Sequence, residues 1–308
     1  MRKIKADFLT GEQARAEREK RMAAISSVIA AVGLTTFKIV VGISTGSLGI
    51  FAEAAHSALD LIAAIVTYLA IRIAVRPADH DHLYGHGKVE NLSAMFETIL
   101  LLITCGWIIY EAFNRIFFKT VAVEASVWAF IVMAVSIIID FSRSRVLYRV
   151  ARKHNSQALE ADALHFSTDI WSSAVVILGL IFVRIAKMKP EWFFLEKADA
   201  VAALLVALIV VIVSVRLGIR TVQALLDAAP RGMYWKIKQT VEEIPGVMDC
   251  HNIRFRSSGP RLFIDIHILT DGNQSLNRAH DLTEKIEKKL LETIPNADIM
   301  VHPEPGEE

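Results

Sequence analysis

Long apolar segments recur along this chain of 308 residues, and they constrain its fold more than any other feature. Six of them follow one another, each close to the length of about 20 residues that a helix needs to cross a bilayer. They lie at roughly 23–45, 48–74, 90–114, 122–142, 159–186 and 198–220. Hydrophobic residues make up 53% of the chain, which is more than a soluble domain usually contains. The sequence therefore predicts an α-helical membrane protein with six transmembrane helices in a lipid bilayer.

The segments on either side of the helices are polar and predict the domain organisation. We expect a charged N-terminal arm at 1–22, a transmembrane domain at 23–224 and a C-terminal domain at 225–308. The last domain alternates helical and strand patterns, in the order helix, strand, strand, helix, strand. These elements are expected at 234–244, 250–256, 261–270, 276–291 and 297–302. They predict a small α+β domain of the ferredoxin or metallochaperone type, whose small core favours a dimer.

Basic residues are unevenly distributed among the connections, which predicts the orientation in the membrane. The arm, a connection near 143–153 and the exit from the sixth helix are basic, whereas the connection near 43–50 lacks Lys and Arg. The basic segment 184–197 runs against this pattern. With six crossings, both termini are expected in the cytoplasm. The net charge of +1 gives no argument for nucleic acid as a partner, and Cys105 and Cys250 cannot form a disulfide framework.

Two of the apolar segments carry a histidine and an aspartate with the same spacing, His56 with Asp60 and His165 with Asp169. Placing a charged side chain at the bilayer centre costs about 2.5–3.5 kcal/mol of free energy. These four side chains therefore need a binding partner that compensates for this cost. Residues four apart share one face of a helix. If the second and fifth helices pack together, two imidazoles and two carboxylates converge into a tetrahedral site that suits Zn²⁺ better than Mg²⁺ or Ca²⁺. The alternative is that each pair is a hydrogen bond in helix packing.

Other polar residues are further candidates, each with a simpler alternative. Glu53 lies one turn from His56, and Asp162 lies one turn from His165. Each is either a relay between the site and its mouth or a polar residue near a helix end. The segment 77–88 holds a mixture of His and Asp side chains that can bind zinc: Asp79, His80, Asp81, His82 and His86. The alternative is that this segment is a solvated polar loop. The C-terminal domain holds scattered candidates for metal ligands, which are His251, His267, His280, His302 and Glu304. The alternative is that they are ordinary surface residues, as scattered histidines usually are.

Three motifs resemble the cation diffusion facilitators, a family that includes bacterial zinc transporters. They are GSLGIFAEAAHSALD at 46–60, PADHDHLYGHGKVE at 77–90 and HFSTDIWSS from 165, and the resemblance covers nearly the whole chain. It implies a homodimer in the inner (cytoplasmic) membrane that exports divalent metal in exchange for protons. It also implies that the transport site is built from His56, Asp60, His165 and Asp169. Many bacterial members have Asp where this chain has His56, so the chain departs from them and resembles the zinc-type members.

The resemblance also implies roles for residues outside the transport site. Asp79, His82 and His86 match a metal site in a loop of some members, whereas His80 and Asp81 are unmatched. The C-terminal candidates match a binuclear zinc site at the dimer interface of some members, and Asp265 near His267 is an additional candidate. Lys88 and Asp227 match a pair that ties the third and sixth helices, with two solvated charges as the alternative.

Classes other than a transporter fit the sequence less well. An intramembrane metalloenzyme needs an open metal position and a general base, but the four ligands fill a tetrahedron and the chain has no His-Glu-x-x-His. A channel would release a tightly held ion too slowly. The remaining alternative is a membrane-bound metal sensor or binding protein without transport. We therefore expect a secondary transporter that works by alternating access, with Zn²⁺ as its ion and no enzymatic activity.

Overall fold

The structure is a computed structural model, and it describes residues 11–117, 127–188, 198–229, 232–259, 261–294 and 297–306. The chain divides into two compact units. The first comprises Met1–Val75 and Val89–Thr221, and the second comprises Arg76–Lys88 and Val222–Glu308. The segment between the second and third helices therefore belongs to the same unit as the C-terminal domain.

The first unit is built from long helices, which confirms the predicted helical membrane domain. They are α1 (Gly11–Thr45), α2 (Leu48–Ala74), α3 (Val89–Phe117), α4 (Val127–His154), α5 (Gln157–Met188) and α6 (Ala198–Leu225). Within the described residues, four stretches are long and apolar enough to cross a membrane; they are Ala14–Thr45, Ile50–Ala74, Val89–Asn114 and Leu204–Leu225.

Two helices extend further than the sequence pattern suggests. Helix α1 begins at Gly11, so half of the expected arm is helical. The expectation of a connection near 143–153 is wrong, because α4 continues through this basic segment to His154. Arg143 is accommodated inside the bundle, where it donates to the Asp140 carboxylate (3.2 Å) and to the Ser27 hydroxyl (3.1 Å). Of the basic segment 184–197, the part after Met188 lies outside the described residues.

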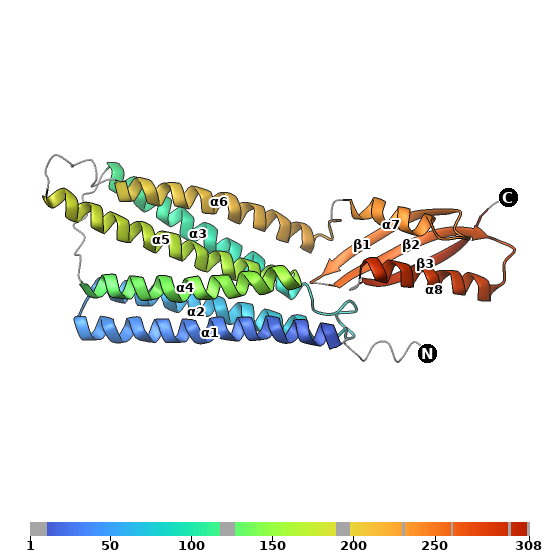
Figure 1. The fold of residues 1–308 in the computed structure, drawn as a ribbon, viewed down its shortest axis with the longest axis horizontal. Helices are drawn as coiled ribbons and strands as arrows, with labels where there is room; N and C mark the ends of the chain where they lie inside the picture. The colour runs from blue at the N-terminus through green and yellow to red at the C-terminus, as the bar shows by residue number, and fades with distance from the viewer. Residues whose placement is uncertain are drawn as a thin grey trace. The chain divides into compact units, whose positions relative to one another are not determined.

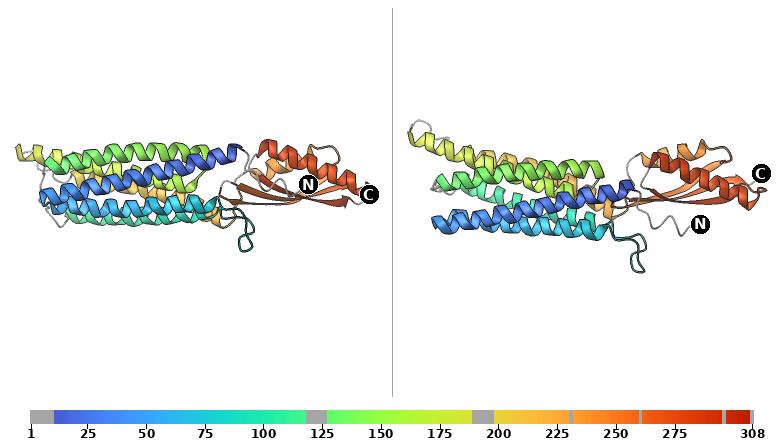
Figure 2. Two further views of the ribbon diagram at one scale, coloured as in Figure 1. Left: turned by 90° about the horizontal axis from the view of Figure 1, so that it is seen from below. Right: turned by 60° about the horizontal axis from the view of Figure 1, so that its bottom comes forward.

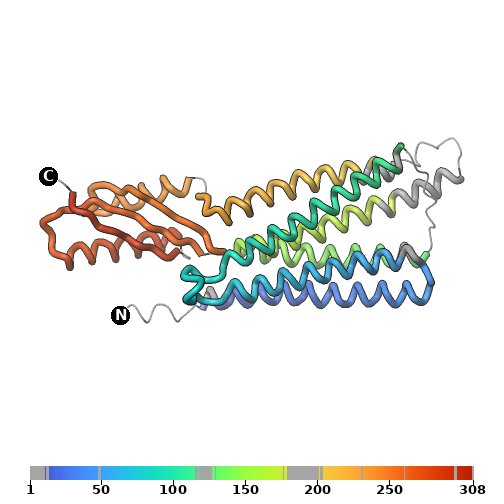
Figure 3. The backbone as a smooth tube through the Cα atoms, turned by 180° about the vertical axis from the view of Figure 1, so that it is seen from behind, coloured from blue at the N-terminus to red at the C-terminus, as the bar shows by residue number. Residues whose placement is uncertain are grey.

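Helix α5 has a central place in the bundle. It packs along α4 and α3 and also contacts α2, whereas α1 packs along α2 and α4. Figure 1 shows α4, α2 and α1 on one side of α5 and α3 and α6 on the other. Seen from behind, α3 crosses over α5 (Figure 3). This arrangement places the polar face of α5 against α2.

A buried ion pair ties the bundle together near the start of α1. The Lys20 ammonium lies 2.6 Å from the Glu90 carboxylate on α3, and both side chains are 2% exposed. The Ser156 hydroxyl, in the turn between α4 and α5, donates to the other oxygen of Glu90. Burial of a charged pair is favourable only when such additional hydrogen bonds complete it. Three parts of the bundle therefore meet at Glu90.

The C-terminal domain has the predicted order of helix, strand, strand, helix, strand. Its elements are α7 (Met233–Glu242), β1 (Asp249–Ser258), β2 (Arg261–Asp271), α8 (Leu276–Thr293) and β3 (Ala297–Gly306). The strands are in the order β1-β2-β3, with β1 antiparallel and β3 parallel to β2. Alternation along β2 turns Ile264, Ile266 and Ile268 into a core shared with α7 and α8. Both helices cover one face of the sheet, as Figure 2 shows.

Candidate metal sites

The four residues predicted for the transport site converge between α2 and α5. The Asp60 carboxylate lies 3.1 Å from His165 Nε2 and 3.9 Å from His56 Nε2. The Asp169 carboxylate lies 3.7 Å from Nε2 of each histidine. Ligand atoms of His56, Asp60 and Asp169 all lie within 4.8 Å of one another. The spacing of four residues on each helix and the packing of α2 on α5 thus produce a compact cluster of two imidazoles and two carboxylates.

Three side chains of this cluster are largely buried, and the fourth, that of His56, is partly exposed. The side chains of His165, Asp60 and Asp169 are 5%, 11% and 14% exposed, whereas that of His56 is 41% exposed. Two buried polar atoms in it, Asp169 Oδ2 and His165 Nδ1, lack a hydrogen-bond partner among the described residues. Buried polar atoms usually have partners, and exceptions often mark sites for an ion or water. The donor set of two nitrogens and two oxygens suits a tetrahedral ion such as Zn²⁺.

The neighbouring acidic residues have partners of their own. Glu53 pairs with the Lys38 ammonium at 3.2 Å. Asp162 accepts a hydrogen bond from the Ser27 hydroxyl on α1 at 3.3 Å. Both contacts join α1 to the helix that carries the acid, which favours the interpretation of these two acids as helix-packing residues.

A polar network beside the cluster was not predicted from the sequence. The Arg143 guanidinium lies 3.4 Å from the centre of the Phe166 ring, next to His165 in the chain. The Phe166 and His165 rings meet edge to face, with centres 5.6 Å apart. Arg143 thus packs against the ring that supports a ligand candidate. The signal in the sequence was Asp140 and Arg143, two opposite charges three residues apart in an apolar stretch.

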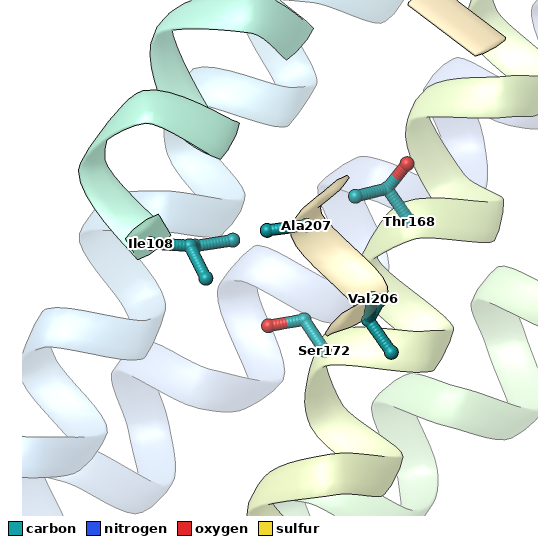
Figure 4. A pocket seen from close by; sticks show the side chains of 5 residues that line it. All are labelled: Ile108, Thr168, Ser172, Val206 and Ala207. Carbon is teal, nitrogen blue, oxygen red and sulfur yellow. The ribbon is translucent and has the colours of Figure 1, made fainter. Parts of the chain in front are cut away.

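Helix α5 also faces a small cavity just beyond the cluster. Its volume is about 10 Å³, and it lies between α3, α5 and α6. Figure 4 shows the hydroxyls of Thr168 and Ser172 with the side chains around them; the lining residues are Ile108, Thr168, Ser172, Val206 and Ala207. A cavity needs about 10–15 Å³ to hold one water, so this one is too small for a hydrated metal ion.

A second cluster lies in the segment between α2 and α3. The Asp79 carboxylate accepts from the backbone N–H of His82 at 2.6 Å and lies 3.2 Å from His82 Nδ1. Its other oxygen lies 3.4 Å from His86 Nε2. The backbone donor of His82 lowers the pKa of Asp79, which keeps the carboxylate ionised and able to bind a cation. His80 and Asp81 are not part of this cluster of described residues.

The same segment is anchored to the C-terminal domain. The Tyr84 ring meets the Phe263 ring edge to face, and the Arg256 guanidinium lies 3.2 Å from the Tyr84 ring centre. The Lys88 ammonium lies 2.9 Å from the Asp227 carboxylate, so the pair expected from the sequence is present. Lys88 precedes α3 and Asp227 follows α6 in the chain.

A third cluster forms on the open face of the C-terminal sheet. His251, His267 and His302 are direct neighbours in the register of β1, β2 and β3. Glu304, two residues along β3, lies 2.7 Å from His267 Nδ1, 3.1 Å from His251 Nε2 and 3.7 Å from His302 Nε2. The hydrogen bond with His267 lowers the pKa of Glu304. One carboxylate therefore links three imidazoles.

The other C-terminal candidates lie elsewhere. His280 is on α8, where its nearest charged partner among the described residues is Glu284 at 3.7 Å. Because α8 covers the face of the sheet opposite the histidine row, His280 does not join that row within one chain. Asp265 is exposed on β2. Cys250, the neighbour of His251 in the chain, is fully buried in the domain core. Burial raises the pKa of the Cys250 thiol to about 11, as expected of a core residue.

Comparison with known proteins gives the family. The cation efflux transmembrane domain matches residues 24–226, and the cytoplasmic domain of cation efflux proteins matches residues 229–306. The cation-efflux pump FieF of Shewanella oneidensis is 31% identical over 286 residues, which cover 92% of this chain and 94% of that protein. FieF of Serratia proteamaculans is 31% identical over 289 residues, 92% of each chain.

A solved structure also matches the C-terminal part. The metal-bound C-terminal domain of the CzcD transporter from Thermotoga maritima is 36% identical, with a TM-score of 0.24, and covers 25% of this chain and 94% of that domain. The family matches span both units of the chain, and the full-length relatives are cation-efflux pumps. The chain is therefore a multi-pass membrane protein of the cation efflux family, the cation diffusion facilitators, and its activity is the efflux of divalent metal cations.

Proposed function

We propose that this chain exports Zn²⁺ from the cytoplasm in exchange for protons. It works as a homodimer in the cytoplasmic membrane, with both termini in the cytoplasm. The observation that carries the proposal is the convergence of His56 and Asp60 on α2 with His165 and Asp169 on α5. Two nitrogen and two oxygen donors favour Zn²⁺ over hard ions that need more oxygens. The expected domain limits at 1–22, 23–224 and 225–308 are part of the proposal.

Exchange for protons follows from the chemistry of the same four side chains. A metal ion needs neutral imidazoles and ionised carboxylates, so binding of Zn²⁺ and binding of protons exclude each other. Zn²⁺ entering from the cytoplasm displaces protons. Once the helices expose the site to the other side, protons from outside bind the ligands and release the metal.

Flux into proteoliposomes tests this proposal. Purified protein is reconstituted with a zinc-sensitive dye inside, and Zn²⁺ is added with and without an imposed pH gradient. We expect uptake that accelerates when the interior is acidic. An equal concentration of Cd²⁺, Fe²⁺ or Mn²⁺ outside should reduce Zn²⁺ uptake by less than half, as expected of ions that bind the site more weakly than Zn²⁺. Uptake that ignores the gradient would remove the proton exchange. Zn²⁺ binding without any uptake would favour the alternative, a membrane-bound metal sensor without transport.

The other two clusters are proposed as regulatory Zn²⁺ sites. The loop site comprises Asp79, His82 and His86. The C-terminal site comprises His251, His267, His302 and Glu304, and in a dimer His280 of a second copy is a further candidate. The open face of the C-terminal sheet, on which the histidine row lies, favours a site completed by a second copy.

Glu304→Gln is expected to weaken Zn²⁺ binding at the C-terminal site by about 10–100-fold, because it removes the charge shared by three histidines. Calorimetric titration of the full chain with Zn²⁺ measures this, and Glu292→Gln, which breaks an exposed pair with Lys289 in the same domain, serves as the control. The lowered pKa of Glu304 keeps its carboxylate ionised and able to bind a cation. Equal affinities in both variants would contradict this site.

Asp227→Asn is expected to slow Zn²⁺ flux several-fold with little change in melting temperature. It removes the charge that pairs with Lys88, and the partly exposed pair contributes only about 0–1 kcal/mol to stability. Asparagine suits the change because Asp227 has a φ of 59°, a conformation that Asn tolerates. Glu292→Gln, which breaks an exposed pair with Lys289, is the control. Unchanged flux in Asp227→Asn would mean that the two charges are merely solvated.

A further inference from the structure

A groove of about 560 Å³ runs between α4 and α5. Its volume falls within the range of about 300–1,000 Å³ that ligand pockets occupy. The helical period of 3.6 places its α5 residues on the face opposite His165 and Asp169. The groove is therefore separate from the candidate transport site. The residues that matter here are Phe141, Ser144, Arg145 and Tyr148 of α4 and Ile170 and Trp171 of α5.

The groove is cationic at one end and apolar at the other. Helices α4 and α5 are antiparallel and joined by a short turn at Asn155 and Ser156. Arg145 and Tyr148 lie nearer this turn, whereas Phe141 and Trp171 lie further from it along their helices. The two aromatic side chains are more than half exposed. A ligand that fits must combine an anionic group with an apolar tail.

The cation of the groove is available to a ligand. Arg145 is exposed, and within the part of the chain that the structure describes, no carboxylate lies within ion-pair distance of it. A second guanidinium, that of Arg152, donates to the Tyr148 hydroxyl at the same end of the groove. The other arginine in this part of α4, Arg143, is already paired with Asp140. Charge at this end is therefore uncompensated within the described residues.

We propose that this groove binds one anionic glycerophospholipid, with its phosphate at Arg145 and an acyl chain against Phe141, Ile170 and Trp171. Basic pockets between membrane helices bind anionic headgroups by this combination of charge and apolar surface. From Ala163 to Ala174 the groove follows α5 for about 16 Å, at 1.5 Å per residue. That length is close to half of the roughly 30 Å hydrocarbon core, which is the depth of a single leaflet.

The leaflet follows from the orientation proposed above, which puts the turn between α4 and α5 in the cytoplasm. The lipid then comes from the cytoplasmic leaflet. The chemistry of the ligand does not depend on that orientation. The competing occupant of an open apolar groove in a membrane is a second copy of this chain, and the experiment below separates the two.

Fluorescence quenching by brominated lipids tests the site in the detergent-solubilised full chain. Brominated phosphatidylglycerol and brominated phosphatidylcholine are titrated separately, and Trp171→Phe identifies the component of the signal that comes from the groove. The test variant is Arg145→Gln. Arg149→Gln is the matched control, because Arg149 lies one turn along the same helix, is exposed and does not line the groove.

We expect phosphatidylglycerol to quench Trp171 at a concentration about fivefold lower than phosphatidylcholine, the effect of one favourable charge near an anionic headgroup. Arg145→Gln should remove this preference, Arg149→Gln should retain it, and an excess of inorganic phosphate should not displace the lipid. Equal quenching by both lipids, or equal loss in both variants, would overturn the proposal. Absent Trp171 quenching together with a crosslink between copies at this face would show that a second copy fills the groove. Because the readout is binding, its failure is distinct from a failure of Zn²⁺ flux.

Discussion

Zn²⁺ flux should fall by at least about 100-fold when Asp60 or Asp169 is replaced by alanine. Loss of a residue that merely orients a metal ligand already costs about 10–100-fold, and here the ligand itself is removed. Asp60 lies within 4 Å of both histidines, and so does Asp169, so removing either carboxylate leaves the site with three of its four candidate ligands. The measurement is the initial rate of Zn²⁺ uptake into proteoliposomes, normalised to the amount of inserted protein.

The control for this effect is Glu53→Gln. It also removes a carboxylate charge from α2, one turn from His56, but glutamine retains an oxygen that accepts from Lys38. We expect this variant to transport at close to the normal rate. If flux persisted in both aspartate variants, the His–Asp pairs would be hydrogen bonds in helix packing, and the function would have to be sought at Asp79, His82 and His86.

Lys20→Met should destabilise the bundle by about 3–5 kcal/mol, the cost of leaving one partner of a buried ion pair without the other. The Glu90 carboxylate then keeps only the Ser156 hydroxyl as a partner among the described residues. Methionine fills most of the space of the lysine stem, so the effect comes from charge rather than from a cavity. Thermal denaturation of the detergent-solubilised chain measures it as a lower melting temperature.

A second substitution separates charge from packing in this prediction. Lys20→Met combined with Glu90→Gln removes both charges of the buried pair and leaves an oxygen for Ser156, so it should recover most of the lost stability. The other partner of Lys20, Glu17, is 22% exposed and can be solvated when the ammonium is lost. Arg15→Gln removes a cation from an exposed pair with Glu19 on the same helix, and it should have little effect. A double variant as unstable as the single one would show that the lysine stem, and not its charge, stabilises this end of the bundle.

Local patterns made much of this architecture predictable. A spacing of four residues places His56 with Asp60 and His165 with Asp169 on one helix face each, whatever surrounds them. Alternation of side chains along β2 likewise places Ile264 in the core and His267 on the opposite face. Such periodicities are properties of a single helix or strand, so they can be read from a single sequence.

Features that depend on partners distant in the chain were not predictable. From the sequence, Arg143 belongs to a basic connection, because its partner Ser27 inside the bundle is 116 residues away. Lys20 likewise belongs, from the sequence, to the charged arm at 1–22, because its partner Glu90 is 70 residues away. The position of His280 required knowing that α8 covers the face of the sheet opposite the histidine row. In each case tertiary contacts, and not local spacing, decide the environment.

At the C-terminal site proposed above, metal binding would depend on the register of the strands and would therefore report correct folding. His302 faces the open side of the sheet, while its neighbour Val301 is buried. A slip of β3 by one residue would exchange these two side chains and carry Glu304 away with His302. Zn²⁺ that binds the aligned strands alone would stabilise them by about 2.7 kcal/mol at 100 times its dissociation constant. Bound metal would thus favour the correctly paired domain, because a domain with β3 out of register could not retain the ion.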